Sequence, residues 1–255
     1  MSHDLVTIPC LSDNYAYLLR CSETGDVACI DVPEAGPIKA ALAEHGWTLS
    51  QVWLTHHHWD HVDGLADLLA DHPAAVVGAK ADAHRLPELN VSVSEGDTVT
   101  LGALEAQIID VSGHTVGHIA FHVPKAHAGF TADSLMALGC GRLFEGTPAQ
   151  MWDSLQKMMN WPADTMICSG HEYTASNAKF ALTVDPENTD LISRAQDIDA
   201  ARAAGKPTVP SELSTELKTN PFLRPADPAI RAHLGMQTAT DAEVFAEIRK
   251  RKDDF

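Results

Sequence analysis

The sequence predicts an α/β protein, because short strand-like segments alternate with helical segments over the first two thirds of the chain. From about His171 onward the strand pattern stops, and only helical patterns follow. Histidines and aspartates recur directly after several of the strand-like segments. Open α/β sheets place their functional sites at such strand ends, so the same pattern that predicts the fold also predicts where a site would lie.

The predicted strands are short runs rich in apolar and β-branched residues. They cover residues 5–9, 15–21, 27–31, 51–54, 75–78, 98–101, 104–110 and 119–123, with shorter runs at 129–131 and 165–168. Helical patterns in the same part of the chain cover residues 37–45, 64–71 and 148–160. Thr147 followed by Pro148 marks the start of the last of these helices, since threonine is a favoured N-cap and proline fits the first helical turn.

The C-terminal part is predicted to be helical. Its helical patterns cover residues 177–184, 189–204, 228–234 and 241–252, with a Pro- and Ser-containing connection at 205–211. Asp227-Pro228 and the capping box from Thr240 to Glu243 mark two of the helix starts. We therefore expect two domains, at 1–170 and 171–255, the second helical; the family resemblance given below implies metal binding and catalysis for the first, and substrate binding without a metal site of its own for the second.

The segment Thr55-His56-His57-His58-Trp59-Asp60-His61 holds the strongest functional signal. It follows the apolar strand 52–54, and alternate side chains at a strand end point the same way, so His56 and His58 can converge on one metal ion while His57 faces elsewhere. Asp60 and His61, past a turn and at the start of a helix suggested over 62–69, can reach a second ion. A surface loop or an expression tag is the plain alternative, which the internal position and the ligand spacing disfavour.

Three more ligand-type residues, His114, Asp133 and His171, each follow a strand-like run. Imidazole and carboxylate groups without thiolate suit zinc, iron or manganese, so the residues indicate a class of metals. Cys140 and Cys168 fall outside the ligand pattern and are predicted to pack in the core. His118, in the same Gly-rich string as His114, is expected to play a supporting or structural part.

These residues resemble the metallo-β-lactamase superfamily, and within it the glyoxalase II (hydroxyacylglutathione hydrolase) family. The superfamily motif is similar to residues 55–61 with His114, Asp133 and His171. The segments more specific to glyoxalase II are Gly139-Cys140-Gly141-Arg142, Glu145-Gly146-Thr147, Gly170-His171-Glu172-Tyr173-Thr174, Asn177, 179–184, Asn220-Pro221-Phe222-Leu223-Arg224, Arg249 and Lys252-Asp253. The similarity runs nearly end to end, and these later segments select one family within the superfamily.

The resemblance implies an αββα sandwich followed by a helical C-terminal domain. It also implies two divalent ions, zinc first with iron or manganese as alternatives. One ion would bind His56, His58 and His114, the other Asp60, His61 and His171, and Asp133 would bridge them. Asp60 and Asp133 are the carboxylates we assign to catalysis.

The implied reaction is hydrolysis of S-2-hydroxyacylglutathione thioesters, typically S-lactoylglutathione to lactate and glutathione, by a metal-bound hydroxide, as the second step of methylglyoxal detoxification. Glutathione carries two carboxylates, so cationic residues are needed to hold it. The positions that match the family's contacts are Arg142, Phe144, Tyr173, Arg249 and Lys252. Phe144 stands where many relatives have Tyr, Arg142 where some have Lys, and Asp63 and Ala132 where Gly is usual.

Two other functions compete with this interpretation. A persulfide dioxygenase of the same superfamily resembles the chain at the first metal motif, but uses one iron and lacks the long helical C-terminal part. A non-catalytic protein with a structural metal would usually close its site with four ligands, often thiolates, which the open acid-bridged set does not match. The number of metal ions per chain separates the three functions.

Composition narrows the setting further. The formal net charge of −17 argues against binding to a nucleic-acid backbone, and no window reaches the roughly 18 apolar residues of a membrane span. The five cysteines form no framework pattern and are expected to be reduced. The start of the chain shows no basic, apolar leader pattern. We expect a cytoplasmic monomer whose partner is a small glutathione thioester.

Overall fold

The structure is a computed structural model that describes residues 3–255. Two compact units divide these residues: one runs up to Val111 and includes Val116–Ala132, and the other joins Ser112–Thr115 to Asp133–Phe255. Each predicted ligand belongs to one of these units. The boundary expected at residue 170 stays a prediction, because it concerns functional domains and the compact units are defined by contacts.

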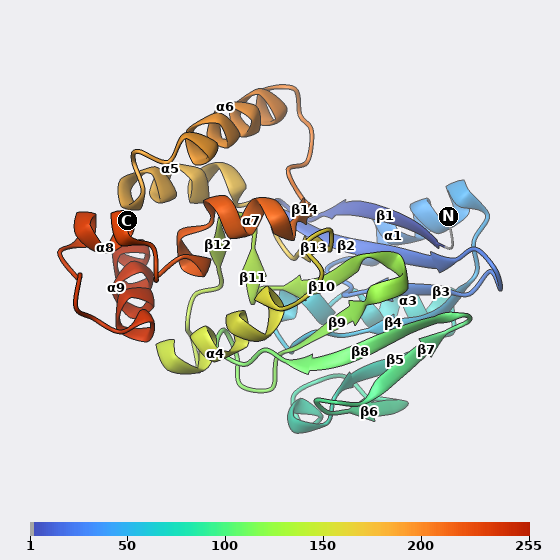
Figure 1. The fold of residues 1–255 in the computed structure, drawn as a ribbon. Coiled ribbons are helices and arrows are strands. Elements are labelled where there is room, and N and C mark those ends of the chain that lie inside the picture. Colours follow the sequence, from blue (N-terminus) through green and yellow to red (C-terminus); the bar gives the residue numbers. More distant parts are fainter. Residues whose placement is uncertain (1–2) are drawn as a thin grey trace. The chain divides into compact units, whose positions relative to one another are not determined.

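The first unit contains a six-stranded sheet in the order β1-β2-β3-β4-β5-β6 (Figure 1). The strands are β1 (His3–Cys10), β2 (Asn14–Cys21), β3 (Val27–Ile30), β4 (Leu49–Trp53), β5 (Ala75–Ala79) and β6 (Val91–Val93). The first three run antiparallel, and β3 to β6 run parallel. Ile30 is in register with Trp53, so β3 and β4 end side by side and the residues that follow them, Asp31 and Thr55, emerge together.

A second layer of strands lies in the same unit, in the order β10-β9-β8-β7. These strands are antiparallel and comprise β7 (Thr98–Leu101), β8 (Leu104–Asp110), β9 (Ile119–Val123) and β10 (Ala128–Ala132). The two layers pack through aromatic side chains: Trp53 stacks on Phe121 with ring centroids 5.0 Å apart, and Tyr17 meets Phe130 at 5.8 Å. This contact between apolar faces confirms the predicted sandwich of sheets.

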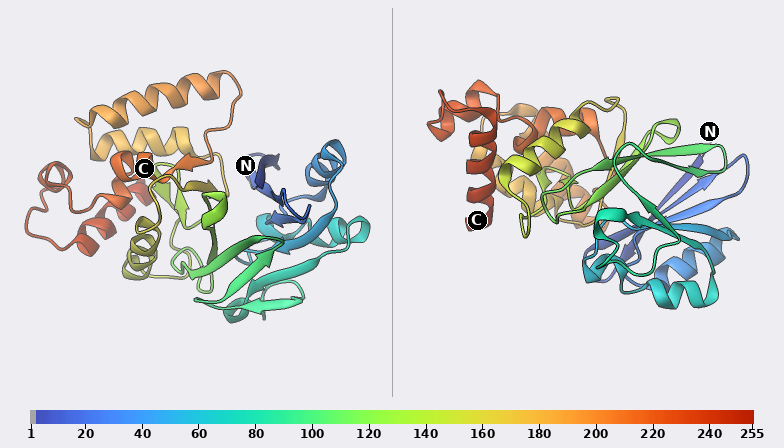
Figure 2. Two further views of the ribbon diagram at one scale, coloured as in Figure 1. Left: turned by 45° about the vertical axis from the view of Figure 1, so that its right-hand side comes forward. Right: turned by 90° about the horizontal axis from the view of Figure 1, so that it is seen from below.

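Helices cover the face of the first sheet that points away from the second (Figure 2). They are α1 (Ala35–His45) and α3 (Leu65–Asp71), and their buried side chains include Ile38, Leu42, Leu65 and Leu68. The helix suggested over 62–69 is wrong in its bounds. A short helix α2 (Trp59–Val62) ends before α3 begins, because Gly64 lies against the backbone of Glu34, where a Cβ would approach to 2.7 Å. Asp60 and His61 therefore lie inside α2.

The second unit is mainly helical, as the sequence predicts from residue 171 onward. Its helices are α4 (Pro148–Met159), α5 (Thr174–Val184), α6 (Thr189–Ala203), α7 (Leu213–Thr219), α8 (Pro228–Leu234) and α9 (Asp241–Asp254). Thr147 and Thr240 form capping boxes, and Asp227 caps α8, which confirms the three predicted helix starts. Helices α5 and α6 lie side by side and share a buried cluster with Leu138 (Figure 1).

Short strands connect these helices, and the sequence prediction missed most of them. β11 (Leu135–Met136) pairs with β12 (Gly139–Cys140) in a tight hairpin, and β13 (Met166–Ser169) pairs with β14 (Ser211–Glu212). β6 and α7 were also not predicted. Segments of two or three strand residues are too short to show a period in the sequence. Among residues 3–255, no helix has both the length and the apolar character needed to cross a bilayer.

Candidate metal centre

In the first unit, three histidines of the motif gather at the end of β4. The ring centroid of His56 lies 4.8 Å from that of His58 and 4.2 Å from that of His61. His56 and His61 are buried, and His58 is partly buried. The ring of His118 stacks on His56 at 4.6 Å, which matches the supporting part expected for it. The strand end and the first turn of α2 thus bring the imidazoles together as the alternation predicts.

Asp31 holds this cluster from the end of the neighbouring strand. Its Oδ1 accepts a hydrogen bond from the backbone N of Thr55 at 2.9 Å, and its Oδ2 accepts from the Thr55 hydroxyl at 2.8 Å. The same Oδ2 lies 2.8 Å from Nδ1 of His61, and an oxygen of Asp31 and a ring nitrogen of each of His56 and His61 lie within 4.8 Å of one another. Asp31 has φ +55°, a left-handed conformation that this network stabilises.

The sequence interpretation missed Asp31. It was placed inside the strand 27–31, although a carboxylate at the end of a parallel strand is itself a signal of a site. The contact that reveals its role joins residues 24 and 30 positions apart in the chain.

The hydrogen bonds fix which nitrogen of each ring carries the proton. The single hydroxyl proton of Thr55 goes to Asp31, so the Thr55 oxygen accepts from Nδ1 of His56, 3.0 Å away. Nδ1 of His61 faces a carboxylate, which accepts, and therefore also carries a proton. In both rings Nε2 then carries the lone pair and can bind a metal ion.

His57 faces away from these rings. Its Nδ1 lies 2.8 Å from Oδ2 of Asp82, a carboxylate that is fully buried and also bound by Arg85. Arg85 in turn donates to the carbonyl of Val116 at 2.7 Å. The middle histidine of the motif is therefore a structural residue that secures the strand end.

Asp60 is oriented by Asn14, at the start of β2. Nδ2 of Asn14 donates to Oδ2 of Asp60 and to its backbone oxygen, each at 3.0 Å. Oδ2 of Asp60 lies 3.8 Å from Nε2 of His61. The Asp60 carboxylate thus lies beside Nε2 of His61, the nitrogen that carries the lone pair because Asp31 accepts a hydrogen bond from Nδ1. Asn14 was not predicted, because a lone Asn at a strand start carries no motif.

In the second unit, Asp133 stands between two histidines. Its Oδ2 lies 3.4 Å from Nε2 of His114 and 3.3 Å from Nε2 of His171. All three residues are buried. One carboxylate oxygen facing two imidazole nitrogens is the local arrangement expected for a bridging ligand.

His114 is oriented by the segment that follows β12. Its Nδ1 lies 2.7 Å from the carbonyl oxygen of Arg142, which accepts, so Nε2 again holds the lone pair. Gly141 allows this close approach: a Cβ at residue 141 would lie 1.9 Å from the Asp133 carbonyl and 3.0 Å from Nδ1 of His114. The backbone of Arg142 therefore serves the metal centre, whatever its side chain binds.

Residue 132 is one of the two positions at which the family resemblance implies glycine. Ala132 adopts φ +41°, in the left-handed region that favours glycine, so the alanine is strained there. Asp63, the other such position, has φ −63° and is unstrained.

The residues predicted to bind glutathione divide by exposure. Three of them are exposed in the second unit: the side chain of Arg142 is 58% exposed, Phe144 is 62% exposed and Tyr173 is 41% exposed. Phe144 lies against the ring of His114 at 5.3 Å, and Tyr173 stacks on His171 at 4.6 Å.

The other two lie on α9. Arg249 is buried, donates to the Cys140 carbonyl at 2.8 Å and pairs with Asp253. Lys252 is partly exposed, with its ammonium over the rings of Phe180 and Phe255. Burial and the neighbouring Arg249 lower the pKa of Lys252.

The thiols take no part in the donor set. Burial raises the pKa of Cys140 to about 11 in spite of the nearby Arg249, and burial also raises the pKa of Cys168. A protonated thiol is a poor ligand. The donors available are therefore imidazole nitrogens and carboxylate oxygens, which suit a divalent transition metal.

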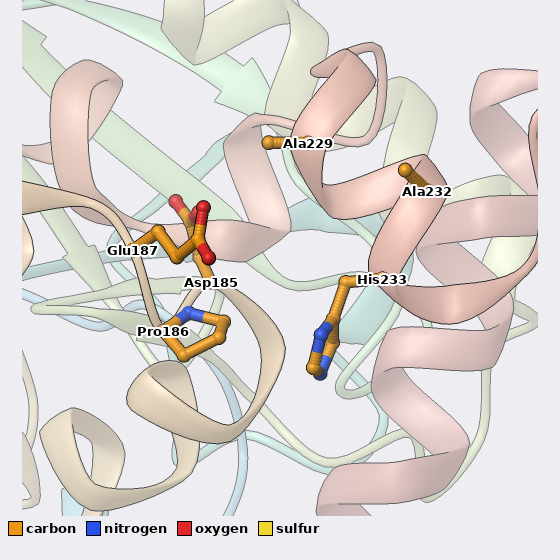
Figure 3. A pocket seen from close by; sticks show the side chains of 6 residues that line it. All are labelled: Asp185, Pro186, Glu187, Ala229, Ala232 and His233. Carbon is orange, nitrogen blue, oxygen red and sulfur yellow. The ribbon is translucent and has the colours of Figure 1, made fainter.

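A separate pocket of about 320 Å³ lies at the C-terminal end of α5 (Figure 3). It is lined by Asp185, Pro186, Glu187, Ala229, Ala232 and His233. Asp185 is already paired with Arg224, and His233 bonds to the Thr183 carbonyl. None of these six lining residues is a predicted ligand or glutathione contact.

Comparison with known proteins assigns the chain to a family. A model of the metallo-β-lactamase superfamily matches residues 15–171, and a model of the hydroxyacylglutathione hydrolase C-terminus matches residues 172–255. The hydroxyacylglutathione hydrolases of Ruegeria pomeroyi and Roseobacter denitrificans are each 64% identical over 255 residues, covering all of both chains. The chain belongs to the hydroxyacylglutathione hydrolase family. The family resemblance drawn from the motifs is confirmed.

Solved structures confirm the metallo-β-lactamase fold at lower identity. The crystal structure of ETHE1 from Myxococcus xanthus aligns with a TM-score of 0.67 and 24% identity, covering 98% of this chain and 90% of that one. The metallo-β-lactamase fold of this chain and its cluster of His and Asp side chains together support the binding of divalent metal.

Removing a predicted ligand should remove metal. We expect His58→Ala and Asp133→Ala each to lower the metal content of the purified protein and to abolish thioester hydrolysis, because the neighbouring residues cannot supply the missing donor. His57→Ala is the matched control and should keep its metal, since its ring faces Asp82. Elemental analysis beside the activity assay checks this. A fully active His58→Ala or Asp133→Ala protein would refute the assignment.

Asp31→Asn should weaken metal binding without removing a ligand. The amide has only one acceptor oxygen, so its NH2 group would face either the Thr55 backbone donor or Nδ1 of His61, and the proton position on His61 would be disturbed. We expect metal affinity to fall by roughly 10- to 100-fold. Chelator competition measures this directly, and an unchanged affinity would show that Asp31 serves only the backbone.

Proposed function

We propose that this chain hydrolyses S-2-hydroxyacylglutathione thioesters, with S-lactoylglutathione giving lactate and glutathione as the second step of methylglyoxal detoxification. The observation that carries the proposal is the full-length match to hydroxyacylglutathione hydrolases, because it includes residues 172–255. The metal motif alone fits many reactions of the superfamily. The C-terminal match favours the thioesterase over the dioxygenase considered above.

The proposed metal centre contains two divalent ions, zinc first with iron or manganese as alternatives. His56, His58 and His114 would bind one ion, Asp60, His61 and His171 the other, and Asp133 both. Support comes from the ring orientations within each unit: Nδ1 of His56, His61 and His114 each face an acceptor, which turns Nε2 into the donor atom. Bound ions of this kind would polarise a carbonyl and lower the pKa of coordinated water to near 7.

The protein's own groups fit thioester cleavage. The leaving group is a thiolate whose conjugate acid has a pKa of about 8.5, so it departs without a strong general acid. Asp60 is held in place by Asn14, and we assign it the role of orienting the attacking water. Asp133, whose Oδ2 faces two imidazoles, is the second carboxylate of the reaction.

Glutathione recognition is assigned to Arg142, Phe144, Tyr173, Arg249 and Lys252. The exposed guanidinium of Arg142 and the partly exposed ammonium of Lys252 are suited to the carboxylates of the carrier. Phe144 and Tyr173 offer exposed apolar faces beside His114 and His171. The buried Arg249 is already bound to a backbone carbonyl, so its substitution would also disturb the protein itself.

We further propose that the protein acts in the cytoplasm as a monomer, with no nucleic-acid or membrane partner. All five cysteines are buried thiols, which suits a reducing compartment. The net charge of −17 disfavours a phosphate backbone as ligand.

The direct test is thiol release from S-lactoylglutathione by protein purified without added metal, with metals counted per chain. Hydrolysis with two ions per chain is the expected result. One iron per chain with oxygen consumption would instead identify a dioxygenase, and an inactive protein with one closed zinc would indicate a structural site.

Lys252→Ala should raise KM for glutathione thioesters and leave kcat and metal content unchanged. The contact lies far from the reacting carbon and is equally strong in the ground and transition states. An exposed ion pair contributes up to about 1 kcal/mol, so KM should rise by about fivefold at most. The effect should shrink with added salt, because the Debye length is only about 8 Å at physiological ionic strength.

A thioester without glutathione's carboxylates is the control substrate, and both proteins should hydrolyse it equally. Lys250→Ala, two residues earlier on α9 and exposed, is the matched control variant. Equal KM values for Lys252→Ala and the parent protein would refute the contact. A lowered melting temperature with loss on both substrates would assign Lys252 to packing against Phe180 and Phe255.

A further inference from the structure

The β11–β12 hairpin links two groups of the metal centre. Asp133 precedes β11 by two positions, and Arg142, whose carbonyl orients His114, follows β12 by two. The base of the hairpin is closed by a hydrogen bond from the backbone N of Gly141 to the carbonyl of Ser134 at 3.1 Å. Any shift of the hairpin therefore moves the Asp133 carboxylate and the acceptor for His114 together.

A buried carboxylate from α7 holds the tip of this hairpin. Glu216 is 0% exposed, and its Oε2 accepts from the backbone N of Leu138 at 2.8 Å. Leu138 lies in the turn with φ +55°, a conformation that needs such support. The other oxygen of Glu216 accepts from Ser211 at 2.7 Å and pairs with Arg194.

The C-terminal helices also bind the hairpin's carbonyl groups. Nδ2 of Asn220 donates to the carbonyls of Met136 and Gly139, each at 3.1 Å, and to Oε2 of Glu216 at 3.1 Å. Nδ2 of Asn177, on α5, donates to the carbonyl of Ala137 at 3.0 Å. The Cys140 carbonyl takes the bond from Arg249 described above. Four hairpin carbonyls, those of residues 136, 137, 139 and 140, are thus held by side chains from α5, α9 and the end of α7.

We propose that Glu216 is a positioning residue of the metal centre, which through the β11–β12 hairpin sets the placement of Asp133 and of the carbonyl that orients His114. The inference rests on the proposed function only in that Asp133 and His114 bind metal. It gives the C-terminal helices a second task, the preorganisation of metal ligands, in addition to contacts with glutathione.

The chemistry of the network requires a carboxylate at residue 216. All of its partners named here are donors: the Leu138 amide, the Asn220 amide group, the Ser211 hydroxyl and the Arg194 guanidinium. Glutamine has the same shape but only one acceptor oxygen, so its NH2 group would face either the Leu138 and Asn220 donors or the Ser211 and Arg194 donors. Two buried donors facing each other leave both unsatisfied, which displaces the hairpin tip or Arg194.

The test compares Glu216→Gln with the parent holoenzyme. Zinc release to increasing concentrations of a chelator should occur at concentrations about tenfold or more lower in the variant, the range typical of residues that orient metal ligands. The cobalt-exchanged variant should also show altered visible absorption bands, because those bands report ligand geometry. A merely destabilised protein with intact ligands would keep the parent spectrum.

Asp185→Asn is the matched control, since Asp185 is also a buried carboxylate of the same unit, and the partners described for it are Arg224 and Asn188, which lie outside the hairpin. It should keep the parent zinc release and cobalt spectrum even if its melting temperature falls. Should Glu216→Gln fail to fold, Asn177→Asp tests the same hairpin from α5, because it replaces the donor to the Ala137 carbonyl by an acceptor.

The outcomes separate cleanly. Loosened zinc and an altered spectrum in Glu216→Gln, but not in Asp185→Asn, support the proposal, and where Glu216→Gln does not fold the same result in Asn177→Asp does so. Parent behaviour in a folded Glu216→Gln protein overturns it, as do parent behaviour in Asn177→Asp where Glu216→Gln does not fold and equal losses in all variants. If the parent protein itself holds no metal at His114 and Asp133, or lacks thioesterase activity, the proposed function fails instead, whatever the variants do.

Discussion

The metal centre that we propose depends on how its imidazoles are protonated: in His56, His61 and His114 an acceptor holds the proton on Nδ1 and leaves the lone pair on Nε2. A histidine in water exchanges between tautomers, and an acceptor at Nδ1 selects the one that binds a metal ion through Nε2. Here the acceptors are the Thr55 hydroxyl, the Asp31 carboxylate and the Arg142 carbonyl. Each of these is supplied by a strand end or by the segment after a hairpin. The strand ends and the hairpin therefore matter to the site because they position these acceptors.

This dependence explains why the sequence indicates candidate ligands but not the residues that orient them. Residues 55–61 lie close together in the chain, and the strand alternation and the turn decide their directions locally. The expectation that His57 faces away from His56 followed from that local geometry. Asp31, Asn14 and Glu216 act through contacts across 24 to 78 residues of sequence. No local pattern marks such a residue, because its partner is defined only by the fold.

The sequence predicts the longer helices and strands of the fold but not the shortest ones, because only the longer elements carry a local pattern. Strand β8 carries a two-residue period, β2 is a long apolar run, and helices α4 and α9 carry capping boxes, and the sequence predicts all four within a few residues. The two-residue strands β11 and β12 carry none. Yet their hairpin joins Asp133 to the acceptor for His114, so the least predictable part of the second unit lies closest to its ligands. Tertiary contacts from α5, α7 and α9 take the place of intrinsic strand propensity there.

Ala132, the residue before Asp133, has a left-handed backbone conformation and is therefore a position at which a substitution could relieve strain beside the candidate metal centre. A non-glycine residue in this conformation costs roughly 1 to 2 kcal/mol, and glycine's greater freedom in the unfolded chain offsets only about 0.5 to 1 of that. The strain of Ala132 lies in the backbone at the last residue of β10. Replacing Ala132 with glycine would relieve this backbone strain at the loss of one buried methyl group, and it would leave every donor atom of the candidate site in place.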